Sequence, residues 1–171
     1  MRPRRAGFTL IELLVVLAIV GVLAAAAVPL QQLVARRAQE QALRQGLRQI
    51  RQALDEHRAA AEAGRIASVA PADAPAASRW PRRLDDLVSG LPTPDEQGRP
   101  RDDGPRLYLL RRLPRDPFAD ATLPAAATWR VRSSQTPPGG PWQRDGETAD
   151  VFDIAPSAQG QALDGSRYED W

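Results

Sequence analysis

The stretch "RRAGFTLIELLVVLAIVGVLAAAAVPL", Arg4 to Leu30, decides the fold of this chain. Within it, residues 8–28 contain only two clearly polar side chains, Thr9 and Glu12. As an α-helix, a segment of this length rises about 30 Å, which is the thickness of the hydrocarbon core of a bilayer. We therefore predict a transmembrane N-terminal helix over residues 8–28.

Basic residues before the apolar run predict its orientation. Arg2, Arg4 and Arg5 all precede Gly7. Positive flanks stay on the cytoplasmic side, so the N-terminus is expected in the cytoplasm and the rest of the chain across the membrane. Removing these three arginines takes the formal net charge from +2 to −1. Such a near-neutral chain gives no electrostatic argument for a nucleic-acid partner.

Glu12 does not suit a passive anchor or a secretory signal, because an unpaired carboxylate in lipid costs about 2–4 kcal/mol. A cut between Gly7 and Phe8 would create a new α-amino group beside the apolar zone. In a stack of identical subunits, Glu12 of one subunit would face that amine of its neighbour and set the register between them. A secretory signal cleaved after Ala24–Ala27 and a plain single-pass anchor stay open as alternatives.

The run "GFTLIELLVVLAIVGVLAAAAVP", residues 7–29, resembles the class III signal of type IV pilins and type II secretion pseudopilins. The resemblance implies that prepilin peptidase cuts after Gly7 and N-methylates Phe8, and that Glu12 is needed for assembly. It also implies that Pro29 is a point where the helix kinks or locally melts. The expected location is the bacterial inner membrane, with a single pass and a periplasmic C-terminal part.

Beyond the apolar run, the sequence turns polar but keeps a helical pattern. One apolar stripe recurs at spacings of four, three and four residues, and Gly64 is a plausible C-cap. The stripe consists of Leu43, Leu47, Ile50 and Leu54. The resulting division of the chain is a cleaved basic leader over 1–7, the transmembrane helix over 8–28, its periplasmic continuation over 29–64, and a C-terminal globular part with a small sheet over 65–171.

The globular part is predicted to hold one short helix and three short strands. The helix would start near Pro81, carry Leu84, Leu87 and Val88 on one side, and end at Gly90. The strands are expected over 106–110, 128–133 and 150–155, with loops between them. A sheet this small needs a partner, and the helix stripe offers one. The fold class is thus α+β: a long N-terminal transmembrane and amphipathic helix packed on a small antiparallel sheet, as in the type IV pilin-like fold.

No set of residues in the sequence suggests catalysis. The chain has no cysteine and a single histidine, His57, which is best interpreted as a packed or surface residue. Ser157 lacks a nucleophile-elbow sequence, and neither a P-loop nor a dinucleotide fingerprint is present. We therefore predict that the protein is not an enzyme.

The second half resembles the major, G-type pseudopilin of type II secretion. Its segment Leu113–Phe118 fits the family's Leu-Pro-x-Asp-Pro-Trp with Phe118 in place of Trp, and the chain lacks the cysteine pair that commonly closes the C-terminal loop of pilus pilins. The resemblance implies a structural subunit of a pseudopilus that pushes exoproteins across the outer membrane. Expected partners are further copies of itself, other pseudopilins, prepilin peptidase, the inner-membrane secretion platform and membrane lipid.

The same resemblance raises the question of calcium in the last loop. Where the family tends to have Ala-Asp-Gly, this chain has Ala158-Gln159-Gly160, so one expected aspartate is missing. Asp153 and Asp164 stay as candidate ligands, because calcium binds several oxygen atoms. No cofactor is otherwise expected. The departure keeps open a divergent subunit or a minor, H-type pseudopilin. A major or minor type IV pilus pilin and a single-pass periplasmic binding protein are further alternatives.

Overall fold

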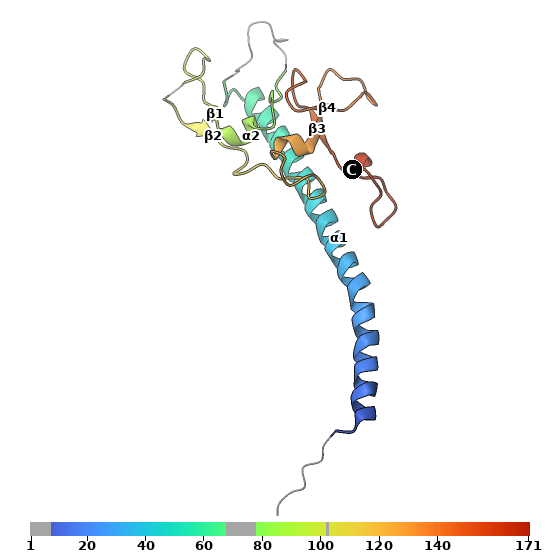
Figure 1. Cartoon of the computed structure of the whole chain (residues 1–171). Coiled ribbons are helices and arrows are strands. Elements are labelled where there is room, and N and C mark those ends of the chain that lie inside the picture. The colour runs from blue at the N-terminus through green and yellow to red at the C-terminus, as the bar shows by residue number, and fades with distance from the viewer. Residues whose placement is uncertain (1–7, 68–77, 102) are drawn as a thin grey trace, which may run out of the picture. The chain divides into compact units, whose positions relative to one another are not determined.

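The computed structural model describes residues 8–67, 78–101 and 103–171. The chain divides into two compact units, Met1–Ala38 and Gln39–Trp171. Figure 1 shows the helices and strands in chain order. They are α1 (Leu10–Glu62), α2 (Asp86–Ser89), β1 (Leu91–Pro92), β2 (Arg106–Leu107), β3 (Trp129–Arg132), β4 (Gln143–Arg144) and β5 (Asp153–Pro156), with two short 3₁₀ turns at Ala126–Thr128 and Tyr168–Asp170.

Helix α1 runs without interruption over 53 residues, which confirms the long helix predicted from the sequence. It ends where expected, because Gly64 has a positive φ of 65°. There the N–H of Gly64 donates to the carbonyl of Ala61 at 3.2 Å, and the N–H of Arg65 donates to that of Ala60 at 2.9 Å. This pair of hydrogen bonds is a Schellman motif, which satisfies carbonyls that the last helical turn would leave unpaired.

The predicted stripe on α1 forms the centre of the core. All four of its residues are buried, and they pack with Trp129 and Val131 of β3 and Ile154 of β5. Leu84 and Leu87, on the predicted short helix, are fully buried in the same cluster. The apolar residues of the helix stripe and the buried, alternate residues of β3 therefore pack in one core, as the α+β prediction requires.

The strands of the described residues form two antiparallel sheets. The larger has the order β4-β3-β5, with Val131 opposite Ile154, and the smaller pairs β1 with β2. Strand β3 confirms the prediction over 128–133. The strand expected over 150–155 begins only at Asp153, because the N–H of Val151 donates to the carbonyl of Pro81 at 2.8 Å.

Three other details of the sequence prediction were wrong. The strand expected over 106–110 stops at Leu107, because the N–H of Leu110 donates to the carbonyl of Leu87 on α2. Strands β1 and β4 lie in stretches expected to be loop or helix end. The helix expected near Pro81 begins only at Asp86, although Gly90, with a φ of 82°, does end it.

Candidate assembly site

The start of α1 is capped by Thr9. Its hydroxyl oxygen accepts the backbone N–H of Glu12 at 3.3 Å, and its carbonyl accepts that of Leu13 at 3.2 Å. Thr9 is therefore the N-cap and Glu12 the third helical residue, the spacing of a capping box. At this position the positive end of the helix dipole favours the carboxylate.

The carboxylate of Glu12 has no cationic partner within the described residues. Its side chain is exposed, and in residues 8–67, 78–101 and 103–171 no ion pair involves it. The helix dipole stabilises a negative charge by only about 0.3–1 kcal/mol at exposed positions, less than the cost of that charge in lipid.

The first turns of α1 expose an apolar surface on every side. Phe8 is 83% exposed and Leu10 is 78% exposed, and even Val16 reaches 51%. This helix is long and apolar enough to cross a membrane, and its most apolar window is not buried anywhere against the chain. Such a surface is unfavourable in water, and its length and composition are consistent with a membrane anchor.

Gly21 lies within this surface and packs against none of the described residues. A Cβ placed on it would meet nothing within 4 Å. Glycine inside a helix costs about 0.5–1 kcal/mol relative to alanine. In membrane helices, small residues let a second helix approach closely. The position is therefore suited to helix–helix contact between molecules.

The remaining predicted site residues are tested unevenly. Phe8 directly precedes the Thr9 cap, whereas Gly7 lies outside the described residues. Pro29 falls within the bounds of α1, but its side chain is not among those described, so the kink stays a prediction. The two calcium candidates, Asp153 and Asp164, lie in the C-terminal region and each contacts an arginine of α1.

Sequence reasoning missed three residues of α1 that hold this C-terminal region. They are Glu40, Arg44 and Arg51, which bond to residues more than one hundred positions away. Their spacings of four and seven residues put them on one side of the helix, next to the apolar stripe. That spacing was the available signal, but no local pattern indicates which distant residues these three side chains bind.

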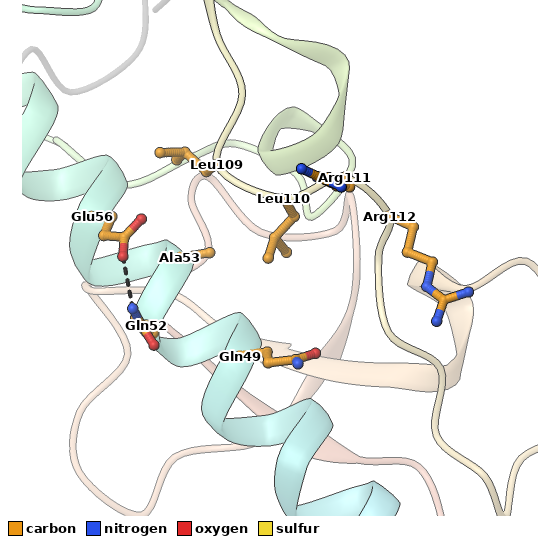
Figure 2. Close-up of a pocket in the computed structure, with 8 residues that line it drawn as sticks. All are labelled: Gln49, Gln52, Ala53, Glu56, Leu109, Leu110, Arg111 and Arg112. Atoms are coloured by element: carbon orange, nitrogen blue, oxygen red, sulfur yellow. Dashed lines mark hydrogen bonds between the residues drawn. The ribbon is translucent and has the colours of Figure 1, made fainter.

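A surface hollow of about 320 Å³ lies beside α1, outside the membrane-type segment. Figure 2 shows Gln49, Gln52 and Glu56 along the helix and Leu110, Arg111 and Arg112 on the opposite side. Gln52 donates to the carboxylate of Glu56 at 2.9 Å. The lining includes no serine, threonine or histidine that could serve as a nucleophile or base.

Comparison with known proteins identifies the N-terminal segment. Residues 2–28 match the family described as the prokaryotic N-terminal methylation motif. No curated protein and no solved structure gives a significant match. The motif indicates the class of type IV pilin-like proteins and pseudopilins, which are substrates of prepilin peptidase and assemble into pilus-like structures. It points to a structural protein, and together with the single long apolar helix it is consistent with a membrane anchor.

Proposed function

We propose that this chain is the major, G-type pseudopilin of a type II secretion system. It would be cut after Gly7, N-methylated at Phe8 and assembled through α1 into a periplasmic pseudopilus that pushes exoproteins across the outer membrane. The observation that carries this proposal is the Glu12 carboxylate in the first turn of an exposed apolar helix, where no described residue forms an ion pair with it. The matched methylation motif covers that carboxylate.

Charge pairing between subunits is the proposed basis of assembly. Cutting after Gly7 leaves an α-amine on Phe8, and amines of this kind are largely protonated at neutral pH in water. One added methyl group keeps the nitrogen basic. When the amine of one subunit lies against Glu12 of the next in lipid, each charge compensates the other. If a subunit is shifted along the filament axis, the two groups separate and both charges are left uncompensated. The pair therefore selects one axial register.

The C-terminal part supports a pseudopilin rather than a pilus pilin. The chain has no cysteine. Within the Leu113–Phe118 segment, Asp116 is almost fully buried and accepts backbone N–H groups from Phe118 at 2.9 Å and from Ala158 at 3.1 Å. This carboxylate connects the segment to the last loop without a disulfide. In the proposed setting the N-terminus lies in the cytoplasm and the C-terminal globular part lies in the periplasm, where other pseudopilins and the secretion platform would contact it.

Gene deletion in the native bacterium, followed by complementation, tests the proposal. Deletion is expected to trap exoproteins in the periplasm, and the wild-type gene should restore their release. Glu12→Ala and Glu12→Gln should be processed normally and yet fail to restore release, because neither carries the charge. Asp55→Ala is the matched control, since Asp55 is an exposed acidic residue of α1 outside the apolar run.

The same experiment separates the competing functions. Normal exoprotein release with loss of surface filaments would identify a type IV pilus pilin instead. Release that is only reduced, with a pseudopilus that still forms, would identify a minor, H-type pseudopilin. A Glu12→Ala variant that restores release completely would contradict the pairing argument.

A further inference from the structure

Arg51 of α1 binds the C-terminal region through all three nitrogen atoms of its guanidinium. Nε donates to Oδ1 of Asp153 at 2.9 Å, Nη1 donates to the carbonyl of Trp171 at 2.8 Å, and Nη2 donates to the carbonyl of Ile154 at 3.1 Å. One side chain therefore fixes the start of β5 and residue 171 together. The planar fork of arginine allows this geometry, which a lysine could not reproduce.

Arg44, about two helical turns earlier, holds the middle of the last loop. Its Nη2 donates to Oδ2 of Asp164 at 2.7 Å, and its guanidinium carbon lies 4.0 Å from the centre of the Trp171 ring. The other oxygen of Asp164 accepts the backbone N–H and the hydroxyl of Ser166, at 3.0 and 2.6 Å. Both carboxylate oxygens of Asp164 thus have donors from the protein.

Glu40 completes the set with a buried carboxylate. Its Oε1 accepts the N–H of Leu163 at 2.8 Å and the hydroxyl of Tyr168 at 3.0 Å. The Tyr168 ring in turn lies between Phe118 and Trp171, with ring centres 4.8 and 5.1 Å away. We call Glu40, Arg44 and Arg51, with their bonds to residues 153–171, the α1 clamp.

These contacts do not fit a calcium ion at the two candidate ligands. Calcium takes six to eight oxygen ligands. Asp153 and Asp164 each lie within 3 Å of a guanidinium nitrogen, so a divalent ion on either carboxylate would meet a positive charge at close range. In the part of the chain that the structure describes, no group of three acidic or histidine side chains could hold a metal.

We propose that the α1 clamp does in this protein what a bound divalent cation would otherwise do: it fixes the loop over residues 157–171 on the domain. The positive charge that balances Asp153 and Asp164 is contributed by the helix itself. The folded domain therefore neither needs nor binds calcium, and its stability is independent of calcium concentration. This inference concerns the C-terminal region and does not depend on the proposed role in secretion.

Thermal unfolding of the full chain in detergent tests the inference without any mutation. The unfolding temperature is expected to be the same in excess EDTA and in excess calcium chloride. A rise in calcium that EDTA reverses would overturn the proposal, because it would reveal a bound divalent ion.

Variants then test the clamp itself. Arg51→Met keeps the aliphatic stem but removes three charged hydrogen bonds, so the unfolding temperature should fall by about 4–8 °C, equally with and without calcium. Arg48→Met is the matched control, since Arg48 is an exposed arginine of the same helix outside the clamp. An Arg51→Met variant as stable as this control, or one that calcium restores, would contradict the proposal.

A local measurement covers the case in which Arg51→Met does not fold. Arg44→Met removes a more exposed contact, and trypsin cleavage after Arg167 reports opening of the last loop. Cleavage is expected to be faster in Arg44→Met than in Arg48→Met, and calcium should protect neither. Equal rates in the two variants would show that Arg44 does not hold the loop.

Discussion

The indole of Trp129 lies directly over Gly46 of α1. Its Cη2 and Cζ2 atoms are 3.5 Å from the position that a Cβ on Gly46 would occupy, and its Nε1–H donates to the carbonyl of Pro114 at 2.9 Å. Trp129 is almost fully buried at this contact. The space between the helix backbone and the first residue of β3 at this contact therefore accommodates little more than a single methyl group.

The loss of stability caused by a substitution at Gly46 should increase with the size of the new side chain. Gly46→Leu is expected to lower the free energy of unfolding by about 1–3 kcal/mol, because the added atoms displace the indole. Gly46→Ala should change it by less than about 1 kcal/mol, since a single Cβ makes ordinary contacts and alanine favours the helix. Thermal unfolding measures both, with Ala42→Leu on the exposed side of α1 as the control for bulk. Equal effects of Gly46→Leu and Ala42→Leu would contradict the packing account.

His57 is expected to make stability depend on pH. Its Nδ1 lies 3.0 Å from the carbonyl oxygen of Arg79, which can only accept, so Nδ1 carries the proton. Burial lowers the pKa of His57 below 6.5, although the Arg79 carbonyl and the charge of Asp86 act in the opposite direction. The unfolded chain therefore takes up a proton at a pH where the folded chain does not. Stability should be complete above 6.5 and fall as the pH drops toward the lower pKa of the folded state.

The variant His57→Gln isolates this contribution. It removes the titrating ring and keeps a side chain able to donate to the Arg79 carbonyl. The difference in unfolding temperature between wild type and His57→Gln should shrink as the pH falls below 6.5. A difference that stays constant over this range would show that His57 does not titrate as described.

The carboxylate of Asp150 accepts four hydrogen bonds from described residues of the globular part. It is nearly fully buried and accepts hydrogen bonds from the hydroxyls of Ser78, Ser133 and Ser134 and from the N–H of Ser134. Asp150→Ala should lower the free energy of unfolding by at least about 2 kcal/mol, because several donors lose their acceptor in a buried place. Asp150→Asn should cost less, and thermal unfolding of the two variants would check that order. The reverse order would contradict the assignment of these bonds.

The pH dependence of Asp150 has a defined sign. Burial alone would raise the pKa of its carboxyl group, but the serine hydrogen bonds outweigh burial and lower it below 3.8. The stabilisation is therefore present above 3.8 and lost as the pH falls further. In Asp150→Asn this part of the acid unfolding should disappear, which a comparison of unfolding temperatures in acid would detect.

Gly21 is expected to matter for assembly and not for the single chain. A Cβ at position 21 meets no atom of the described residues within 4 Å, so membrane insertion and cleavage of Gly21→Leu should proceed as in the wild type. In a helix bundle the added side chain would keep neighbours apart, and filaments should be lost. Val22→Leu is the control, because that position is already large. Electron microscopy of assembled filaments gives the readout, and normal filaments from Gly21→Leu would exclude close packing at this position.

Local patterns predicted the helix far better than the sheets. The stripe Leu43–Leu54 and the Gly64 cap follow from spacing and backbone conformation, which neighbouring residues determine. Strands β1 and β4 have two residues each and exist only through pairing with distant segments, so no periodicity marks them. The start of strand β5 is predicted three residues early, because no local pattern shows that Asp150 and Val151 bond to residues outside the sheet strand.

In the candidate site and the C-terminal region, too, contacts between neighbouring residues could be predicted and contacts between distant residues could not. Thr9 and Glu12 have the spacing of a cap, and the sequence alone indicated an unusual carboxylate. The resemblance to major pseudopilins makes Asp153 and Asp164 candidate calcium ligands, and no local pattern predicts their arginine partners, which lie 102 and 120 positions away. Only the folded chain brings these charges together.

The most direct test of the account is the mass of the N-terminal peptide of the protein extracted from native membranes. We expect a peptide that begins at Phe8 and carries one added methyl group, and we expect Gly7→Val to leave the leader in place. A wild-type peptide that begins at Met1, or one that begins after Ala27, would contradict processing by prepilin peptidase and with it the paired role of Glu12.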